Sequence, residues 1–174
     1  MKRRLFKSIV LLLAILITWG CKRNLQQKIF DHYNHYGKTG ICTVSINDLT
    51  TFEWDKMYVF GSSANNEIIS GTVNFAYRGN PIYAGFRRIL FTWGRTKMYE
   101  EDYQPRSYRN SVIDFKIIDD SILNVRAYSF TQEDAFFMIS REKIPGSCNN
   151  CFLYLLIRLE NKNITIDSNS HKND

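Results

Sequence analysis

Apolar residues form one unbroken block near the start of the chain and short, spaced runs after it. Ser8 to Trp19 carries no charge and consists mainly of Ile, Leu and Val. Four basic residues precede the block: Lys2, Arg3, Arg4 and Lys7. The block holds about 12 residues, which is the length of a signal-peptide core, whereas a membrane-spanning helix needs about 20. The pattern predicts an export signal over residues 1–20, cleaved before Cys21.

Residues 24–36, which follow the leader, have the spacing of an amphipathic helix. Apolar side chains recur at three- and four-residue intervals, at Leu25, Ile29, Phe30 and Tyr33, so they share one face of a helix. Asn24 is a favourable capping residue at the start, and glycines at 37 and 40 end the pattern. We expect the apolar face of this helix to pack on the body of the protein.

From residue 41 onward the apolar period changes to two, which is the repeat of a half-buried β-strand. We predict strands over 41–46, 52–60, 72–77, 88–93, 96–101, 112–118, 122–128, 135–141 and 152–159, and a short helix over 64–69. Turn residues suggest that 88–93 pairs with 96–101 around Gly94 and Arg95, and that 112–118 pairs with 122–128. The segments 135–141 and 152–159 form the last expected pair.

Connections of hairpin length favour antiparallel pairing. We therefore predict a single α+β domain over residues 21–160, with an N-terminal helix over 24–36 and a predominantly antiparallel sheet of about six to eight short strands. A small β-sandwich or barrel is the alternative. Residues 161–174 are polar and lack an apolar period, which predicts a disordered tail.

Most of the net positive charge of the chain lies in the predicted leader. The formal net charge of the 174 residues is +6. Four of the 23 basic residues lie in the leader and no acidic residue does, so 19 Lys and Arg stand against 17 Asp and Glu in the remainder. A nearly balanced body gives no reason to expect a nucleic-acid partner. The many Phe and Tyr residues suit well-filled strand faces.

The end of the leader, residues 17–21, reads Ile-Thr-Trp-Gly-Cys and resembles the lipobox of bacterial lipoproteins. The resemblance implies that Cys21 is acylated, becomes the new N-terminus and attaches the protein to a membrane. Thr18 stands where Leu is common and Trp19 is bulkier than usual, so secretion as a soluble protein and an uncut signal anchor remain alternatives. Lys22, in place of the Asp that retains enterobacterial lipoproteins at the inner membrane, favours the outer membrane.

A second resemblance lies in the segment Phe52 to Phe60, which contains Trp54-Asp55-Lys56. It is similar to a strand found in small bacterial lipoproteins that follows an N-terminal helix, and the segments 112–115 and 135–137 are similar to later strands of such proteins. The likeness covers about the central half of the chain. It implies an envelope location and a small mixed domain, and it implies no reaction.

Cys148 and Cys151 have the spacing of a thiol–disulfide pair. A redox-active pair needs a depressed thiol pKa, usually from a helix N-terminus, and here an apolar, strand-like run follows instead. A turn brings such residues close enough for a local disulfide, and an oxidising envelope favours a structural one. An envelope thiol–disulfide enzyme is the alternative. Pairing of Cys42 with Cys148 or with Cys151 also remains open, beside a buried Cys42 thiol on its strand.

Two further groups of polar residues have the composition of metal ligands. His32 and His35 lie three residues apart near Asp31, but a zinc site needs three or four converging ligands. The acidic run 100–102 lacks the glycine and the spacing of a calcium loop. We expect both groups to be solvated and predict neither a metal nor a cofactor.

The segment Trp54-Asp55-Lys56 is expected to place an aromatic core anchor beside exposed charges, with Asp55 on the opposite face from its neighbours. The chain contains no phosphate loop, nucleophile elbow or other catalytic motif. The sequence therefore favours a non-catalytic, lipid-anchored binding module of the bacterial envelope. Its expected partners are the membrane, through Cys21, and an envelope protein or surface component.

Overall fold

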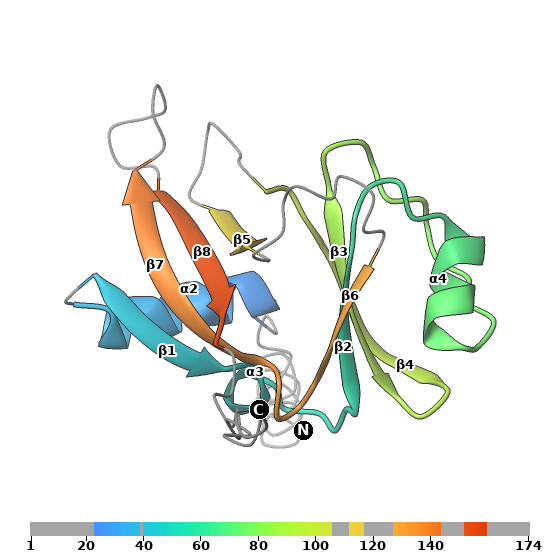
Figure 1. Ribbon diagram of the computed structural model, residues 1–174, viewed down its shortest axis with the longest axis horizontal. Helices are drawn as coiled ribbons and strands as arrows, with labels where there is room; N and C mark the ends of the chain where they lie inside the picture. The colour runs from blue at the N-terminus through green and yellow to red at the C-terminus, as the bar shows by residue number, and fades with distance from the viewer. Residues whose placement is uncertain (1–22, 39, 106–111, 117–126, 144–151, 160–174) are drawn as a thin grey trace, which may run out of the picture.

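The computed structural model describes residues 23–38, 40–105, 112–116, 127–143 and 152–159. Two four-stranded sheets lie side by side (Figure 1), with strand orders β1-β7-β8-β5 and β4-β3-β2-β6. The first sheet contains β1 (Ile41–Ser45), β7 (Phe136–Lys143), β8 (Phe152–Arg158) and β5 (Val112–Lys116). The second contains β4 (Thr96–Tyr103), β3 (Arg87–Trp93), β2 (Lys56–Phe60) and β6 (Ala127–Thr131). The helices are α2 (Leu25–Tyr36), α3 (Ile46–Leu49) and α4 (Asn66–Val73).

The helix α2 is defined at both ends by local chemistry. The Asn24 side chain accepts a hydrogen bond from the Gln27 amide at 2.9 Å, which satisfies one of the open donors of the first turn. At the other end the Gly37 amide donates to the Tyr33 carbonyl at 2.6 Å. A Cβ at Gly37 would stand 2.7 Å from the Tyr33 ring, so glycine lets the buried tyrosine pack under the end of the helix.

The second sheet is buried on both faces. Met57 and Val59 of β2 belong to the core that the two sheets and α2 share, whereas Tyr58 and Phe60 belong to a second cluster beneath α4. In Figure 1, α4 covers the side of the second sheet that faces away from the first sheet. A strand covered in this way has buried residues at successive positions instead of alternating ones.

Aromatic contacts join the two sheets across the shared core. Phe130 of β6 meets Phe137 of β7 with ring centroids 5.2 Å apart, and Tyr103 of β4 meets Phe115 of β5 at 6.1 Å. The chain itself crosses between the sheets in the short turn from β6 to β7. The sheets are therefore held together by side-chain packing and by short crossings of the chain.

Arg87 provides a polar link between the sheets. From β3 its Nη1 donates to the Asp114 carboxylate of β5 at 2.6 Å and to the Phe115 carbonyl at 3.4 Å. Asp114 is buried, so its charge needs this compensation. The arginine of one sheet thus binds both a side chain and the backbone of the edge strand of the other sheet.

The α+β class is confirmed in its broad form, as short helices with two mostly antiparallel sheets. We predicted one sheet, and the described strands form two. Over the described residues neither sheet closes into a barrel. The hairpin of 88–93 with 96–101 is confirmed as β3 and β4, and the pair 135–141 with 152–159 as β7 and β8.

Two local predictions are wrong. In the described parts of the predicted hairpin of 112–118 with 122–128, β5 pairs in parallel with β8 whereas β6 pairs with β2, so these parts do not pair with each other. The segment 72–77 is not a strand, because α4 continues to Val73. Both errors come from apolar residues whose partners lie far away in the sequence, where local spacing carries no information about pairing.

The link through Arg87 gives the first prediction. Arg87→Met keeps the aliphatic stem but removes the hydrogen bonds to β5, and we expect the free energy of unfolding to fall by about 2–3 kcal/mol. Urea unfolding of purified protein measures the change. Arg158→Met is the control, because both side chains of its ion pair with Asp134 are 42% exposed and removing the pair should cost only about 0–1 kcal/mol. Equal losses in the two variants would contradict a special role for Arg87.

Candidate functional site

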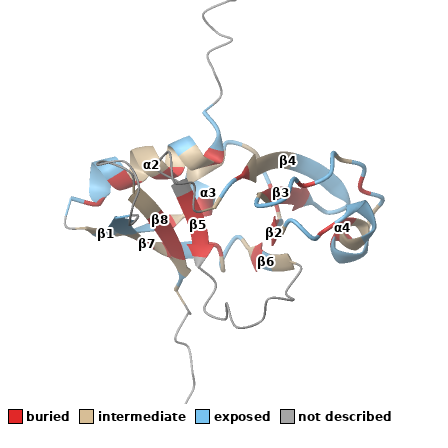
Figure 2. Ribbon diagram, turned by 90° about the horizontal axis from the view of Figure 1, so that it is seen from above, coloured by how far each residue is buried: buried red, intermediate tan, exposed pale blue. Residues whose placement is uncertain are grey.

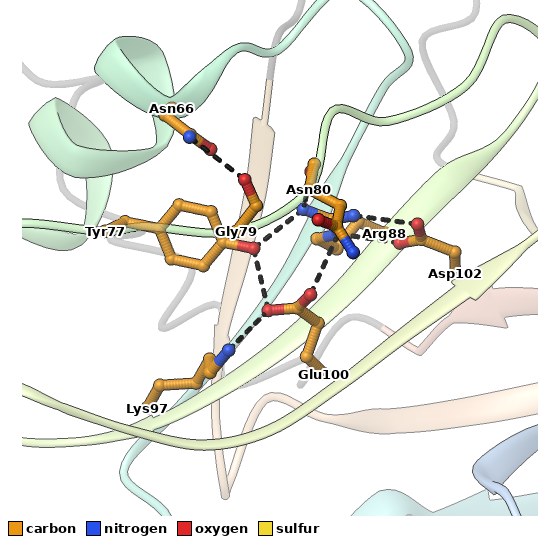
Figure 3. A network of polar contacts seen from close by, with 8 residues as sticks. All are labelled: Asn66, Tyr77, Gly79, Asn80, Arg88, Lys97, Glu100 and Asp102. Atoms are coloured by element: carbon orange, nitrogen blue, oxygen red, sulfur yellow. Dashed lines mark hydrogen bonds and ion pairs between the residues drawn. The ribbon is translucent and has the colours of Figure 1, made fainter.

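A network of charged and polar side chains lies between the second sheet and the segment that follows α4 (Figure 3). At its centre is Arg88 of β3, only 1% exposed. Its Nε and Nη2 donate to the two carboxylate oxygens of Asp102 at 2.7 and 2.8 Å. Its Nη1 donates to the Tyr77 hydroxyl at 2.7 Å and to the Asn80 carbonyl at 2.8 Å. A bidentate pair of this kind is the strongest geometry for an arginine and a carboxylate.

Glu100 closes the network. Its Oε2 accepts from the Tyr77 hydroxyl at 2.7 Å and from Lys97 Nζ at 2.9 Å, and its Oε1 lies 3.7 Å from Arg88 Nε. Two cations and two carboxylates therefore balance one another. Each nitrogen of the Arg88 guanidinium donates to a protein acceptor, so the network is suited to fixing the chain after α4 on the sheet.

The electrostatics of Tyr77 exclude it as a base at neutral pH. Burial is the main reason that the pKa of Tyr77 rises to about 12, and the hydrogen bond to Glu100 raises it further, against the opposing effect of Arg88. Burial also raises the pKa of Glu100, but hydrogen bonds from Tyr77 and Lys97 and the charge of Arg88 outweigh it and leave that pKa lowered. At neutral pH the tyrosine stays protonated and Glu100 stays charged.

The hairpin register explains why these residues meet. Arg88 stands opposite Asp102, and Glu100 lies two residues before Asp102 on the same face of β4. Gly79 completes the arrangement, because a Cβ there would overlap the Tyr77 hydroxyl. The expectation that the acidic run 100–102 is solvated is wrong. The signal that could have located the network is the alternation of acidic residues opposite Arg88 in the predicted hairpin.

Glu101 points to the other face of β4 and holds the start of α2. One carboxylate oxygen accepts from the Leu25 amide at 2.8 Å and from the Tyr99 hydroxyl at 2.6 Å, and the other accepts from Gln26 Nε2 at 2.8 Å. A carboxylate at this position also interacts favourably with the helix dipole. Glu101 therefore fixes the N-terminal end of α2 to β4, and the Tyr99 hydroxyl accepts a second, longer bond from the Leu25 amide at 3.4 Å.

The segment Trp54-Asp55-Lys56 has a structural role. Trp54 is fully buried and its indole N–H donates to Thr50 Oγ1 at 2.9 Å, as expected of a core anchor. Asp55 accepts from Thr92 Oγ1 at 2.9 Å and from the Gly94 amide at 2.6 Å. Gly94 has φ +55°, a backbone conformation that favours glycine. Asp55 thus fixes the turn between β3 and β4.

A pocket of about 380 Å³ opens at the start of α4. Five of its eight lining residues have polar side chains, with one carboxylate and no basic group among them: Ser62, Ser63, Ala64, Asn65, Asn66, Glu67, Pro81 and Ile82. Asn66 Nδ2 donates to the Gly79 carbonyl at 3.0 Å, which connects this pocket to the segment that the Arg88 network holds. Asn65 is already used as the cap of α4, accepting from the Ile68 amide at 2.9 Å.

The cysteine and histidine predictions have different outcomes. Cys21, Cys148 and Cys151 lie outside the described residues. Cys42 carries a free, half-buried thiol on β1, and burial raises its pKa, which makes the thiol less reactive. His32 Nε2 lies 2.8 Å from the Thr43 carbonyl. Among the residues that the structure describes, no three His, Cys, Asp or Glu side chains converge on a metal position.

Comparisons with known proteins find no relative of this chain. No protein-family model matches the sequence, and neither the curated proteins nor the solved structures contain a match. Within the described ranges, no helix has the length and apolar character needed to cross a membrane.

Tyr77→Phe gives the second prediction. The variant removes the hydroxyl that joins Arg88 to Glu100 and leaves a donor and an acceptor without this partner, so we expect a loss of about 1–3 kcal/mol in unfolding free energy. Chemical denaturation measures it. Tyr83→Phe is the control, since Tyr83 is largely exposed, and it should unfold like the wild type. A wild-type midpoint for Tyr77→Phe would show that the network contributes nothing to stability.

The lowered pKa of Glu100 gives the third prediction. A carboxyl whose pKa is lower in the folded state stabilises the fold above its ordinary value of 4.5 and loses that contribution as the pH falls through the folded value. Between about pH 5 and about pH 3, the unfolding free energy of Glu100→Gln should therefore fall less steeply than that of the wild type. Glu133→Gln, at an exposed glutamate, is the matched control for the loss of a carboxylate. Parallel curves for Glu100→Gln and the wild type would contradict the assignment.

Proposed function

We propose that the protein is a lipid-anchored module of the bacterial cell envelope that binds another envelope component and carries out no chemistry of its own. The observation that carries the proposal is the leader, which has a basic start, an apolar core too short for a membrane span, and Gly20-Cys21 at its end. In this proposal Cys21 is acylated after cleavage, the outer membrane is the favoured location, and residues 21–160 form one domain that includes the N-terminal helix.

The start of α2 supports a close attachment to the membrane. Only three residues separate Cys21 from Leu25, and Glu101 holds Leu25 and Gln26 on β4. An extended chain covers at most about 3.5 Å per residue, so Cys21 lies within about 14 Å of Leu25. Acylation with two or three chains would make the attachment durable, because one chain alone binds only weakly.

A binding role agrees with the surface of the described residues. Large apolar side chains are exposed on several elements: Tyr36, Ile41, Tyr83, Trp93, Met98 and Phe136. Aromatic residues and methionine are enriched in protein interfaces. The polar network around Arg88 is internally satisfied, and Tyr77 stays protonated, so this network offers no acid–base pair for a reaction.

Acylation gives the fourth prediction. Cells fed a clickable fatty acid should incorporate the label into the wild type and into Cys42→Ala, but not into Cys21→Ala, because only Cys21 follows the signal. The intact mass of the labelled protein should equal that of residues 21–174 plus its acyl groups. Cys42→Ala is the matched control, since it removes a thiol that the structure places on a strand.

Different outcomes would support the alternatives. Equal labelling of Cys21→Ala and wild type would exclude acylation at this residue. A free amine at residue 21 without lipid would indicate a secreted soluble protein, and a chain that still begins at Met1 would indicate an uncut anchor. Rapid exchange of Cys148 and Cys151 with small disulfides would favour a thiol–disulfide enzyme, whereas a bond resistant to reduction indicates a structural disulfide.

A further inference from the structure

We propose that the turn end of the β3–β4 hairpin lies on the phospholipid surface and sets the orientation of the tethered domain. The hairpin end is defined here as residues 93–98. The inference rests on the proposed function, because it requires the lipid on Cys21. It adds to that function the surface by which the domain meets the bilayer.

The hairpin end exposes the side chains that favour a membrane interface. Trp93 is 49% exposed and Met98 is 40% exposed, and they lie five residues apart on either side of the turn. Arg95 occupies the turn, and Lys97, which follows it, is paired with Glu100 while its side chain remains 43% exposed. Tryptophan prefers the headgroup region of bilayers, and basic side chains are attracted to anionic lipids. Apolar and cationic groups are therefore combined at one end of a rigid element.

The turn is held rigidly, so these side chains are presented in a defined place. Asp55 binds both Thr92 and the Gly94 amide. The register of the hairpin shifts between Phe91 and Thr92, which is a β-bulge and turns local side chains out of the regular alternation. The exposed apolar residues thus lie on a fixed turn.

The path of the chain from Cys21 brings the lipid to the same strand. Leu25 binds Glu101 of β4, and β4 runs from there to Thr96 at the turn, about 17 Å away at 3.4 Å per residue. The connection from Leu25 to Cys21 spans at most about 14 Å. Figure 2 shows α2 and β4 along the same side of the molecule, with the exposed half of β4 directed away from α2. A modest tilt of the domain therefore brings the hairpin end to the bilayer.

Side chains on one face of the second sheet link the start of α2 to the hairpin end. Arg23 and Leu25 line a small cleft with Phe91 and Tyr99, and Phe52 packs against both aromatic rings. Trp93 lies two residues beyond Phe91, at the end of β3. Arg23, which follows the proposed lipid by two residues, and Trp93 therefore border the same part of the domain.

The test uses tryptophan fluorescence of the lipidated protein, purified from membranes and inserted into vesicles of phosphatidylethanolamine and phosphatidylglycerol. The chain contains three tryptophans: Trp19 is lost with the leader, and Trp54 is fully buried. We expect brominated phospholipids to quench Trp93, its emission to shift to the blue, and its accessibility to acrylamide to fall. Trp93→Phe should lose the lipid-quenched component. Tyr83→Phe, at an exposed aromatic residue elsewhere, should retain it.

The possible results separate this inference from the proposed function. Protein that floats with the vesicles and has a lipid-quenched Trp93 supports both. If the protein floats but Trp93 stays accessible to acrylamide and is not quenched by brominated lipid, the proposed orientation is wrong. The hairpin end is then available to a protein partner. Protein that neither carries lipid nor floats overturns the anchor and the inference together. The unlipidated Cys21→Ala protein should show no lipid quenching, because the tether is what concentrates the hairpin end at the surface.

Discussion

The second sheet must be covered on both faces, and most of the architecture follows from that requirement. β2 and β3 are buried at nearly every position, and an apolar face left in water would cost the free energy that burial otherwise supplies. One face is covered by the first sheet together with α2, and the other by α4 and the segment after it. The helices and the first sheet therefore all serve to cover the second sheet.

Burial on both faces also decides what the polar residues of β3 do. Arg88 cannot remain charged in this position without partners, because an uncompensated buried charge is very unfavourable. Asp102, Tyr77 and Glu100 supply those partners, and in doing so they fix the chain after α4. Arg87, the preceding residue, faces the other way and joins the sheets through Asp114. Two consecutive arginines thus stabilise the two sides of the sheet.

The polar contacts at β4 also hold the start of α2. Glu101, between two acidic residues that serve Arg88, turns to the opposite face and holds the start of α2. Through that contact the proposed lipid, α2 and the exposed hairpin end are arranged around one strand. With the proposed lipid on Cys21, only three residues would separate the anchor from Leu25, which would restrict how the domain can turn at the membrane.

Local pattern in the chain was sufficient for the broad α+β class and for the β3–β4 and β7–β8 pairs, because these depend on neighbours in sequence. It was insufficient for the partners of β5 and β6, for the second sheet and for the role of residues 100–102. Those depend on which distant segment covers each strand, and a strand buried on both faces loses the alternation that reports its orientation. Acidic residues that look solvated in a linear chain become partners in ion pairs and hydrogen bonds only when folding brings Arg88 and the Leu25 amide beside them.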